Sequence, residues 1–230
     1  MRVGILAAGD TPRRLAEEFG HYAGMFESLL DGHGFDWRVF DVPRGEFPER
    51  PEACDAYLIT GAAAGVYDPD PWIGDLLAFL RAARGKAKLV GVCFGHQAIA
   101  QAFGGQVIKS PKGWGVGLHT YVVGERQDWM DAAPTFSLSA SHQDQVVEPP
   151  PGATVVAGSD FCPNGMLAYG DEAISLQLHP EFAPDYSIAL IAGRRGDRIP
   201  EDLAARAIES LRKPDDHEQV AGWIAGFLTK

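Results

Sequence analysis

The chain has 230 residues, of which 46% are hydrophobic and 22% charged, and its formal net charge is −11. This balance is typical of a globular protein with a sizeable core. The acidic excess argues against nucleic acid or an anionic membrane surface as a partner. The first ten residues contain only a short apolar run, so we expect no signal peptide. No run in the chain approaches the roughly 18 apolar residues of a membrane span, and we therefore expect a cytoplasmic location.

The first half of the chain alternates segments typical of strands and of helices. Apolar residues recur at spacings of four and three over residues 15–29, which predicts one helix ended by Gly32 and Gly34. Further helices are expected over residues 71–83 and from Cys93 to about Phe103. The strands predicted here are Arg2–Ala7, Asp36–Val42, Ala56–Thr60 and Lys88–Val92. This alternation favours a parallel sheet covered on both faces.

The second half is richer in strands, and its turns favour an antiparallel extension of the sheet. The predicted strands are Leu118–Val123, Thr135–Ser139, Thr154–Ala157, Met166–Tyr169 and Ala173–Leu178. Three helices are expected at the end: Pro184–Arg194, Glu201–Arg212 and Asp216–Leu228. With no repeat or linker in the sequence, we interpret residues 1–230 as one domain.

The most informative segment is Gly91-Val92-Cys93-Phe94-Gly95, which lies between an apolar strand and a helix. A nucleophile on a sharp strand-to-helix turn sits in a strained conformation, and glycines on either side remove side chains that would collide. The helix dipole would stabilise a Cys93 thiolate, and the N–H of Phe94 would face a developing oxyanion. An isolated cysteine is more often a buried core residue, but the two glycines favour a nucleophile.

His179 is the best candidate for the base, because it ends an apolar strand at Leu178-His179-Pro180-Glu181. Pro180 forces the chain to turn, so that the Glu181 carboxylate can return to the imidazole and fix its tautomer. The order cysteine, histidine, acid differs from that of α/β-hydrolases, in which the acid precedes the histidine. We interpret His96, directly after the elbow, as structural.

The remaining cysteines, Cys54 and Cys162, suggest no disulfide framework. The sequence has no CxxC or HExxH motif, and we expect no metal site and no cofactor. The glycine-rich segment at residues 112–117 is not a GxGxxG motif, and we interpret it as a loop beside the pocket.

Three motifs together resemble class I glutamine amidotransferases, the Cys-His-Glu group that includes the glutaminase domain of GMP synthase. They are residues 91–97 (GVCFGHQ), residues 141–144 (SHQD) and residues 179–181 (HPE). Their order and spacing extend the resemblance over nearly the whole chain. The resemblance implies a flavodoxin-like α/β fold with a central, mostly parallel sheet flanked by helices and an antiparallel extension.

The resemblance also implies roles for individual residues. Cys93 would attack a glutamine carboxamide, His179 would pass a proton to the departing ammonia, and Glu181 would orient His179. The oxyanion hole would be formed by the N–H groups of Gly61 and Phe94. The residues expected to hold the glutamyl group are Gln97, Ser141, Gln143 and Asp144. The loop at residues 60–68 lacks the proline that many relatives carry there.

Three functions fit these residues. The favoured one is a glutaminase that releases ammonia through a thioester on Cys93 and passes it to a separate synthase, because the sequence has neither a P-loop nor the Ser-Gly-Gly-x-Asp-Ser loop of ATP pyrophosphatases. The second is a self-sufficient γ-glutamyl peptidase or hydrolase, whose leaving group is an amine. The third, a non-catalytic binding protein on the same fold, is disfavoured by the intact set of Cys93, His179 and Glu181.

Overall fold

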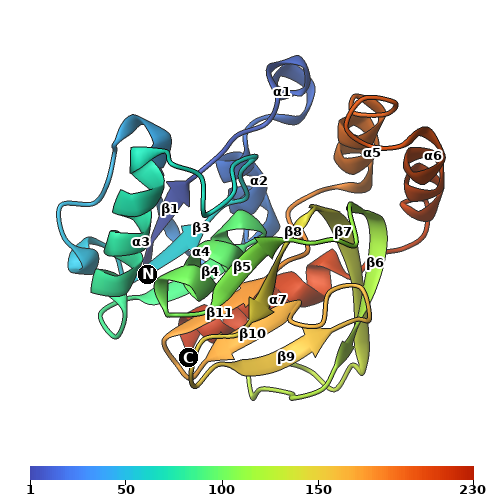
Figure 1. The fold of residues 1–230 in the computed structure, drawn as a ribbon. Helices are drawn as coiled ribbons and strands as arrows, with labels where there is room; N and C mark the ends of the chain where they lie inside the picture. Colours follow the sequence, from blue (N-terminus) through green and yellow to red (C-terminus); the bar gives the residue numbers. More distant parts are fainter.

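Five apolar segments form the parallel part of a nine-stranded sheet, in the order β2-β1-β3-β4-β11 (Figure 1). Every residue of β3 and β11 is buried, as expected for strands covered on both faces. The bounds are β1 Arg2–Ala7, β2 Asp36–Asp41, β3 Ala56–Ile59, β4 Lys88–Val92 and β11 Ala173–Leu176. The expected α/β fold with a parallel core is confirmed.

The sheet continues beyond β11 with antiparallel strands, in the order β10-β9-β6-β7. A separate two-stranded sheet pairs β5 with β8. The bounds are β5 Gln106–Lys109, β6 Gly115–Val123, β7 Thr135–His142, β8 Asp144–Glu148, β9 Thr154–Gly158 and β10 Met166–Tyr169. The antiparallel extension predicted from the sequence is therefore present.

Seven helices cover the sheet in this computed structural model, which describes all 230 residues. They are α1 Arg13–Phe19, α2 Tyr22–Leu29, α3 Pro71–Ala83, α4 Phe94–Ala102, α5 Pro184–Ala192, α6 Glu201–Ser210 and α7 His217–Thr229. Two main cores result, one including apolar residues of α2 and α7 and the other including those of α3 and α4. Helices α5 and α6 lie beside β6 and β7, and α1 contacts α5 (Figure 1). No helix combines the length and apolar character needed to cross a membrane.

The single helix predicted over residues 15–29 is wrong, because the structure has two. The backbone of Gly20 has a φ of 74°, which ends α1 before α2 begins at Tyr22. The apolar spacing continues through this break, since both helices face the protein interior.

Several strand boundaries also differ from the predicted ones. Val42 does not belong to β2 but begins a 3₁₀ turn, Val42–Arg44, with Pro43 at its start. A second 3₁₀ turn covers Pro51–Ala53. Strand β11 ends at Leu176, and His179 instead forms an isolated bridge with Ser139 of β7.

Candidate active site

Cys93 occupies the turn between β4 and α4 and is the only non-glycine residue with a positive φ, at 53°. A Cβ on Gly91 would lie 2.4 Å from the carbonyl oxygen of Gly95, and a Cβ on Gly95 would lie 2.3 Å from that of Ile59. Both distances are far too short for carbon and oxygen. The two glycines therefore permit the turn that brings the thiol to the N-terminus of α4, as the sequence predicted.

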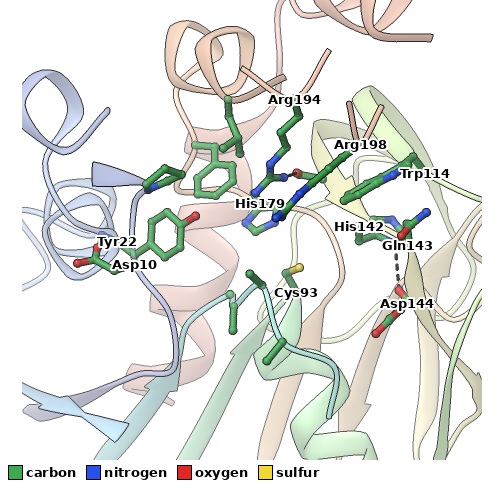
Figure 2. A pocket seen from close by; sticks show the side chains of 18 of the residues that line it. Asp10, Tyr22, Cys93, Trp114, His142, Gln143, Asp144, His179, Arg194 and Arg198 are labelled. Atoms are coloured by element: carbon green, nitrogen blue, oxygen red, sulfur yellow. Dashed lines mark hydrogen bonds between the residues drawn. The ribbon is translucent and has the colours of Figure 1, made fainter. Parts of the chain in front are cut away.

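His179 and Glu181 form a buried pair next to this turn. The His179 Nδ1 lies 2.7 Å from Glu181 Oε1, and the side chains are 4% and 0% exposed. The imidazole stacks on the Phe182 ring with centroids 3.9 Å apart. The backbone N–H of His179 donates to the Ser139 carbonyl. Figure 2 shows His179 and Cys93 in the same pocket. These contacts fix the ring on its Nδ1 side and leave Nε2 for chemistry.

Electrostatics distinguish His179 from the other buried histidines. Burial alone would lower the pKa of His179, but the Glu181 carboxylate and the neighbouring Cys93 outweigh it and raise the pKa to about 10. Burial lowers the pKa of His96 and of His142 to about 3. Both imidazoles are therefore neutral at physiological pH, with the His96 ring bonded to Ser175 and that of His142 to the Asp144 carbonyl.

Gly61 lies on the loop between β3 and α3, directly beside His179 and Cys93. A Cβ at this position would lie 3.1 Å from His179 Cε1 and 3.7 Å from Cys93 Cβ. The backbone N–H groups of Gly61 and Phe94 have no acceptor within the protein. They are therefore free to donate to an oxygen bound near the Cys93 sulfur.

The β3–α3 loop has a defined conformation although it lacks the proline of many relatives. At one end, the Thr60 hydroxyl accepts from Ala8 N at 3.0 Å and donates to the Gly61 carbonyl at 3.1 Å. At the other end, Gly65 N donates to Asp68 Oδ2, and the Tyr67 hydroxyl donates to Asp144 Oδ2, each at 2.8 Å. These bonds within the chain hold residues 62–64 at the pocket.

The residues expected to hold a glutamyl group all line the pocket around Cys93. Gln97 Nε2 donates to the Asp144 carbonyl at 3.1 Å and to Gln177 Oε1 at 3.0 Å, which directs its own Oε1 away from these partners. The Gln143 carbonyl accepts from Ser110 N, and the Ser141 hydroxyl accepts from Arg194 Nη1 at 3.1 Å. Burial raises the pKa of Asp144.

The pocket has a cavity volume of about 550 Å³ and extends to two sides of Cys93. Gln143 and Asp144 lie on one side, and Tyr22 and Asp10 lie on the other (Figure 2). The Tyr22 side is walled by apolar groups: Pro12, Tyr22, Phe182 and Leu190. The cavity thus continues past His179 and away from the expected glutamyl subsite.

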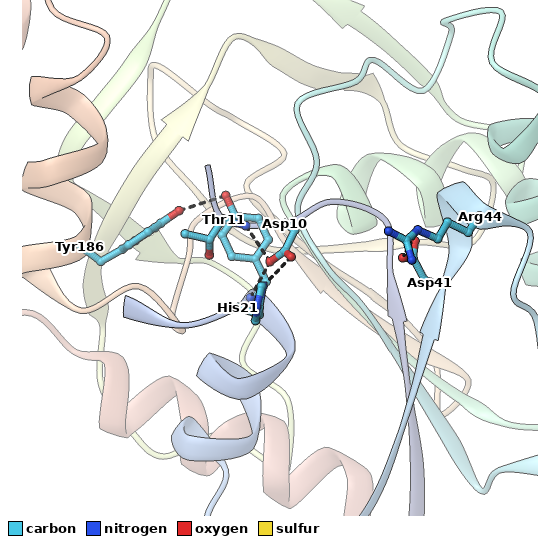
Figure 3. Close-up of polar contacts among 7 residues, drawn as sticks. Asp10, Thr11, His21, Asp41, Arg44 and Tyr186 are labelled. Atoms are coloured by element: carbon cyan, nitrogen blue, oxygen red, sulfur yellow. Dashed lines mark hydrogen bonds and ion pairs between the residues drawn. The ribbon is translucent and has the colours of Figure 1, made fainter. Parts of the chain in front are cut away.

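The wall on the Tyr22 side is held in place by Asp10, at the end of β1 (Figure 3). Asp10 Oδ1 accepts from the backbone N–H of Thr11 and, more weakly, of Tyr22, while Oδ2 lies 2.6 Å from His21 Nδ1. The Tyr186 hydroxyl donates to that of Tyr22 at 3.1 Å. The segment that carries α1 is therefore anchored beside the pocket.

Several pocket residues have no counterpart in the sequence-based site. They are Asp10, Arg14, Tyr22, Trp114, Phe182, Arg194, Asp197 and Arg198. Of these residues, only Trp114 lies in a segment that the sequence predicted to be beside the pocket, the glycine-rich loop at residues 112–117. The others come from helix ends and loops without a motif. No group of three or more His, Cys, Asp or Glu side chains is arranged to hold a metal ion.

Comparisons with known proteins give a family match, curated relatives and a solved structure of the same fold. The family model described as "Glutamine amidotransferase class-I" matches residues 37–188. The chain is 28% identical over 243 residues to a glutamine amidotransferase-like protein of Schizosaccharomyces pombe, covering 98% of both chains. It is 28% identical over 225 residues to gamma-glutamyl peptidase 2 of Arabidopsis thaliana, covering 92% of this chain and 89% of that protein. The crystal structure of a glutamine amidotransferase from Methylobacillus flagellatus has the same fold, with a TM-score of 0.79 at 22% identity over 99% of this chain and 92% of that one.

Proposed function

Because this chain belongs to the class I glutamine amidotransferase family, we propose that it hydrolyses γ-glutamyl amide bonds through a thioester on Cys93. The observation that carries the proposal is the convergence of three features on one pocket. Cys93 stands at the elbow before α4, His179 is bonded to the buried Glu181, and the N–H groups of Gly61 and Phe94 are free. A nucleophile, an oriented base and two oxyanion donors are the parts that acyl transfer requires.

In the first half of the reaction, the Cys93 sulfur attacks the γ-carbonyl carbon and the carbonyl oxygen becomes an oxyanion. The N–H groups of Gly61 and Phe94 stabilise this charge. The C–N bond then breaks, and protonated His179 gives its proton to the departing nitrogen. The Glu181 carboxylate favours the imidazolium form that makes this transfer possible.

In the second half, neutral His179 takes a proton from water, which attacks the γ-glutamyl thioester. The C–S bond breaks, glutamate leaves and Cys93 is restored. Gln97 and the backbone of residues 141–144 hold the glutamyl group during both halves. In this proposal Glu181 keeps its charge throughout and acts by orienting the ring.

We favour a leaving group larger than ammonia, which means a γ-glutamyl peptide or amine as substrate. Ammonia needs no subsite, yet the pocket continues past His179 to an apolar wall that includes Tyr22 and Phe182. The leaving nitrogen receives its proton from His179, so its substituent would occupy this side. The alignment with a gamma-glutamyl peptidase along 89% of that protein supports the same choice.

Transfer of ammonia to a separate synthase, favoured from the sequence alone, is the second candidate. The family assignment supports it, since glutamine is the amide donor that gives this family its name. The two candidates share the thioester and differ in the leaving group.

The test is a comparison of glutamine with γ-glutamylglycine at equal concentrations. Glutamate release would be measured for the purified protein and for Cys93→Ala. We expect higher kcat/KM with the dipeptide and no turnover by the variant. Faster hydrolysis of glutamine would favour ammonia transfer, and no turnover of either compound would contradict enzymatic activity on γ-glutamyl amides.

A further inference from the structure

Three arginines line the pocket without an acidic partner: Arg14 at α1, and Arg194 and Arg198 after α5. The arginines that form ion pairs are Arg44, Arg84, Arg195, Arg206 and Arg212. The contrast is clearest within one segment, because Arg195 is paired with Glu201 and faces away from the pocket, whereas Arg194 and Arg198 line it. Figure 2 shows Arg194 and Arg198 directed toward the centre of the pocket.

The guanidinium of Arg194 has lost much of its hydration without gaining a negatively charged partner. Arg194 is partly buried, and burial together with nearby Arg198 lowers the pKa of its guanidinium. Its one polar side-chain contact is the bond from Nη1 to Ser141 Oγ, and its guanidinium carbon lies 5.9 Å from the Trp114 ring centroid. A guanidinium has five N–H donors, so most of those of Arg194 remain available to a ligand.

Arg14 approaches the pocket from the other wall, and its guanidinium lies over Gly193, the residue before Arg194. A Cβ on Gly193 would lie 1.7 Å from Arg14 Nη2, so the guanidinium occupies the space of a missing side chain. The φ of Gly193 is −76°, which any residue can adopt, so the backbone gives no reason for a glycine there. The absence of a side chain at position 193 is what lets the Arg14 guanidinium lie over the backbone next to Arg194.

The acidic groups of the pocket do not neutralise this cluster. Asp10 is bonded to His21, and Asp144 lies on the glutamyl side, bonded to Tyr67. Asp197 is exposed on the loop after α5 and forms no ion pair with any of the three arginines. An anionic ligand would therefore meet unpaired guanidinium groups.

We propose that Arg14, Arg194 and Arg198 bind a carboxylate carried by the leaving group, so that the preferred substrates are γ-glutamyl peptides with a free C-terminus. This inference rests on the proposed function. Arg14 lies on the wall formed by the segment of Pro12 and Tyr22, the side on which the substituent of the leaving nitrogen would lie. Arg194, which is bonded to Ser141, and Arg198 point toward the centre of the pocket (Figure 2), so a carboxylate on that substituent would lie between them and Arg14. A guanidinium matches the two oxygens of a carboxylate, whereas neither ammonia, the leaving group of glutamine, nor a simple amine carries such a group.

The experiment compares γ-glutamylglycine with γ-glutamylglycinamide, which has nearly the same shape but no terminal charge. The quantity measured is the ratio of their kcat/KM values. Charge-assisted hydrogen bonds of this kind predict a ratio of about 10 to 100 for the unaltered protein. Both substrates use the same thioester, so a substitution that lowers the reactivity of Cys93 or the folded fraction reduces both kcat/KM values equally and leaves their ratio unchanged.

Arg14→Ala and Arg194→Ala should each lower the ratio by about 10-fold. Their matched controls are Arg13→Ala, the neighbouring exposed residue on α1, and Arg195→Ala, which breaks only the pair with Glu201. Both controls should keep the ratio of the unaltered protein. A salt titration should also reduce the ratio in the unaltered protein.

Gly193→Ala tests whether the position of the Arg14 guanidinium over residue 193 matters, without removing any charge. The new methyl group would displace the Arg14 guanidinium, which can move because it ends a flexible side chain. The ratio should fall as it does in Arg14→Ala, with little change in Tm. A ratio near 1 in the unaltered protein, or a ratio that none of Arg14→Ala, Arg194→Ala and Gly193→Ala changes, would overturn this inference alone. Failure to hydrolyse either substrate would instead overturn the proposed function.

Discussion

Gly61→Ala tests whether the β3–α3 loop and the His179 imidazole touch as closely as the structure indicates. The added Cβ would lie 3.1 Å from His179 Cε1, so one of the two must move by a few tenths of an ångström. His179 can hardly retreat, because Glu181 holds its Nδ1 at 2.7 Å and Phe182 covers one face. Since a misplacement of about 1 Å can cost about 100-fold in rate, we expect kcat to fall by about 3- to 10-fold.

Folding should be nearly unaffected by Gly61→Ala, with a change in the free energy of unfolding below about 1 kcal/mol. Gly74→Ala is the matched control, because Gly74 lies within α3 with no atom near its missing Cβ. It should keep full activity and gain about 0.5–1 kcal/mol of stability. The assay is glutamate release from γ-glutamylglycine, together with chemical denaturation. Equal activity in the two variants would refute the contact between residue 61 and His179.

Three further predictions concern the pocket. Cys93→Ala should lose about 10³-fold or more in kcat/KM, while Cys54→Ala should stay active. An active Cys93→Ala beside an inactive Cys54→Ala in glutamate-release assays would remove Cys93 from the mechanism. Glu181→Gln should be folded by circular dichroism and retain more activity than Cys93→Ala. The pKa of His179 is raised to about 10 from 6.5, so its proton stabilises the folded state fully below about pH 6.5, and this contribution is lost as the pH rises toward 10. Denaturation at pH 7 and pH 10 should thus show a larger loss of stability for the unaltered protein than for Glu181→Gln, and equal losses would contradict the His179–Glu181 coupling. Gln97→Ala should mainly raise KM for γ-glutamylglycine, and an unchanged KM would make Gln97 an ordinary helix residue.

The parts of the candidate site whose conformation could be predicted from the sequence have local causes. Gly91 and Gly95 flank Cys93 because their neighbours leave no room for a Cβ. This steric requirement produces a pattern of two glycines around a cysteine that can be recognised within five consecutive residues. Likewise, Pro180 places Glu181 next to His179 within one turn of chain. The family resemblance rests on these short segments and is confirmed by the match over residues 37–188.

The parts that the sequence did not predict depend on contacts between distant residues. Arg14 and Arg194 lie 180 positions apart in the chain and line one pocket only because α1 contacts α5, where the Arg14 guanidinium lies over Gly193. Nothing in the sequence around either arginine differs from an ordinary solvated helix end. The break at Gly20 was missed for a related reason, since α1 and α2 both turn apolar residues toward the interior and so continue one apparent helical spacing.

The central claim is that different γ-glutamyl substrates pass through one thioester on Cys93. Hydroxylamine added to the assay would intercept this thioester in competition with water and give γ-glutamyl hydroxamate. If the intermediate is common, glutamine, γ-glutamylglycine and γ-glutamylglycinamide must give the same ratio of hydroxamate to glutamate, whatever their individual rates. A common thioester on Cys93 predicts this constant ratio and the loss of both products in Cys93→Ala. A ratio that changes with the leaving group, or glutamate formed by Cys93→Ala, would contradict it.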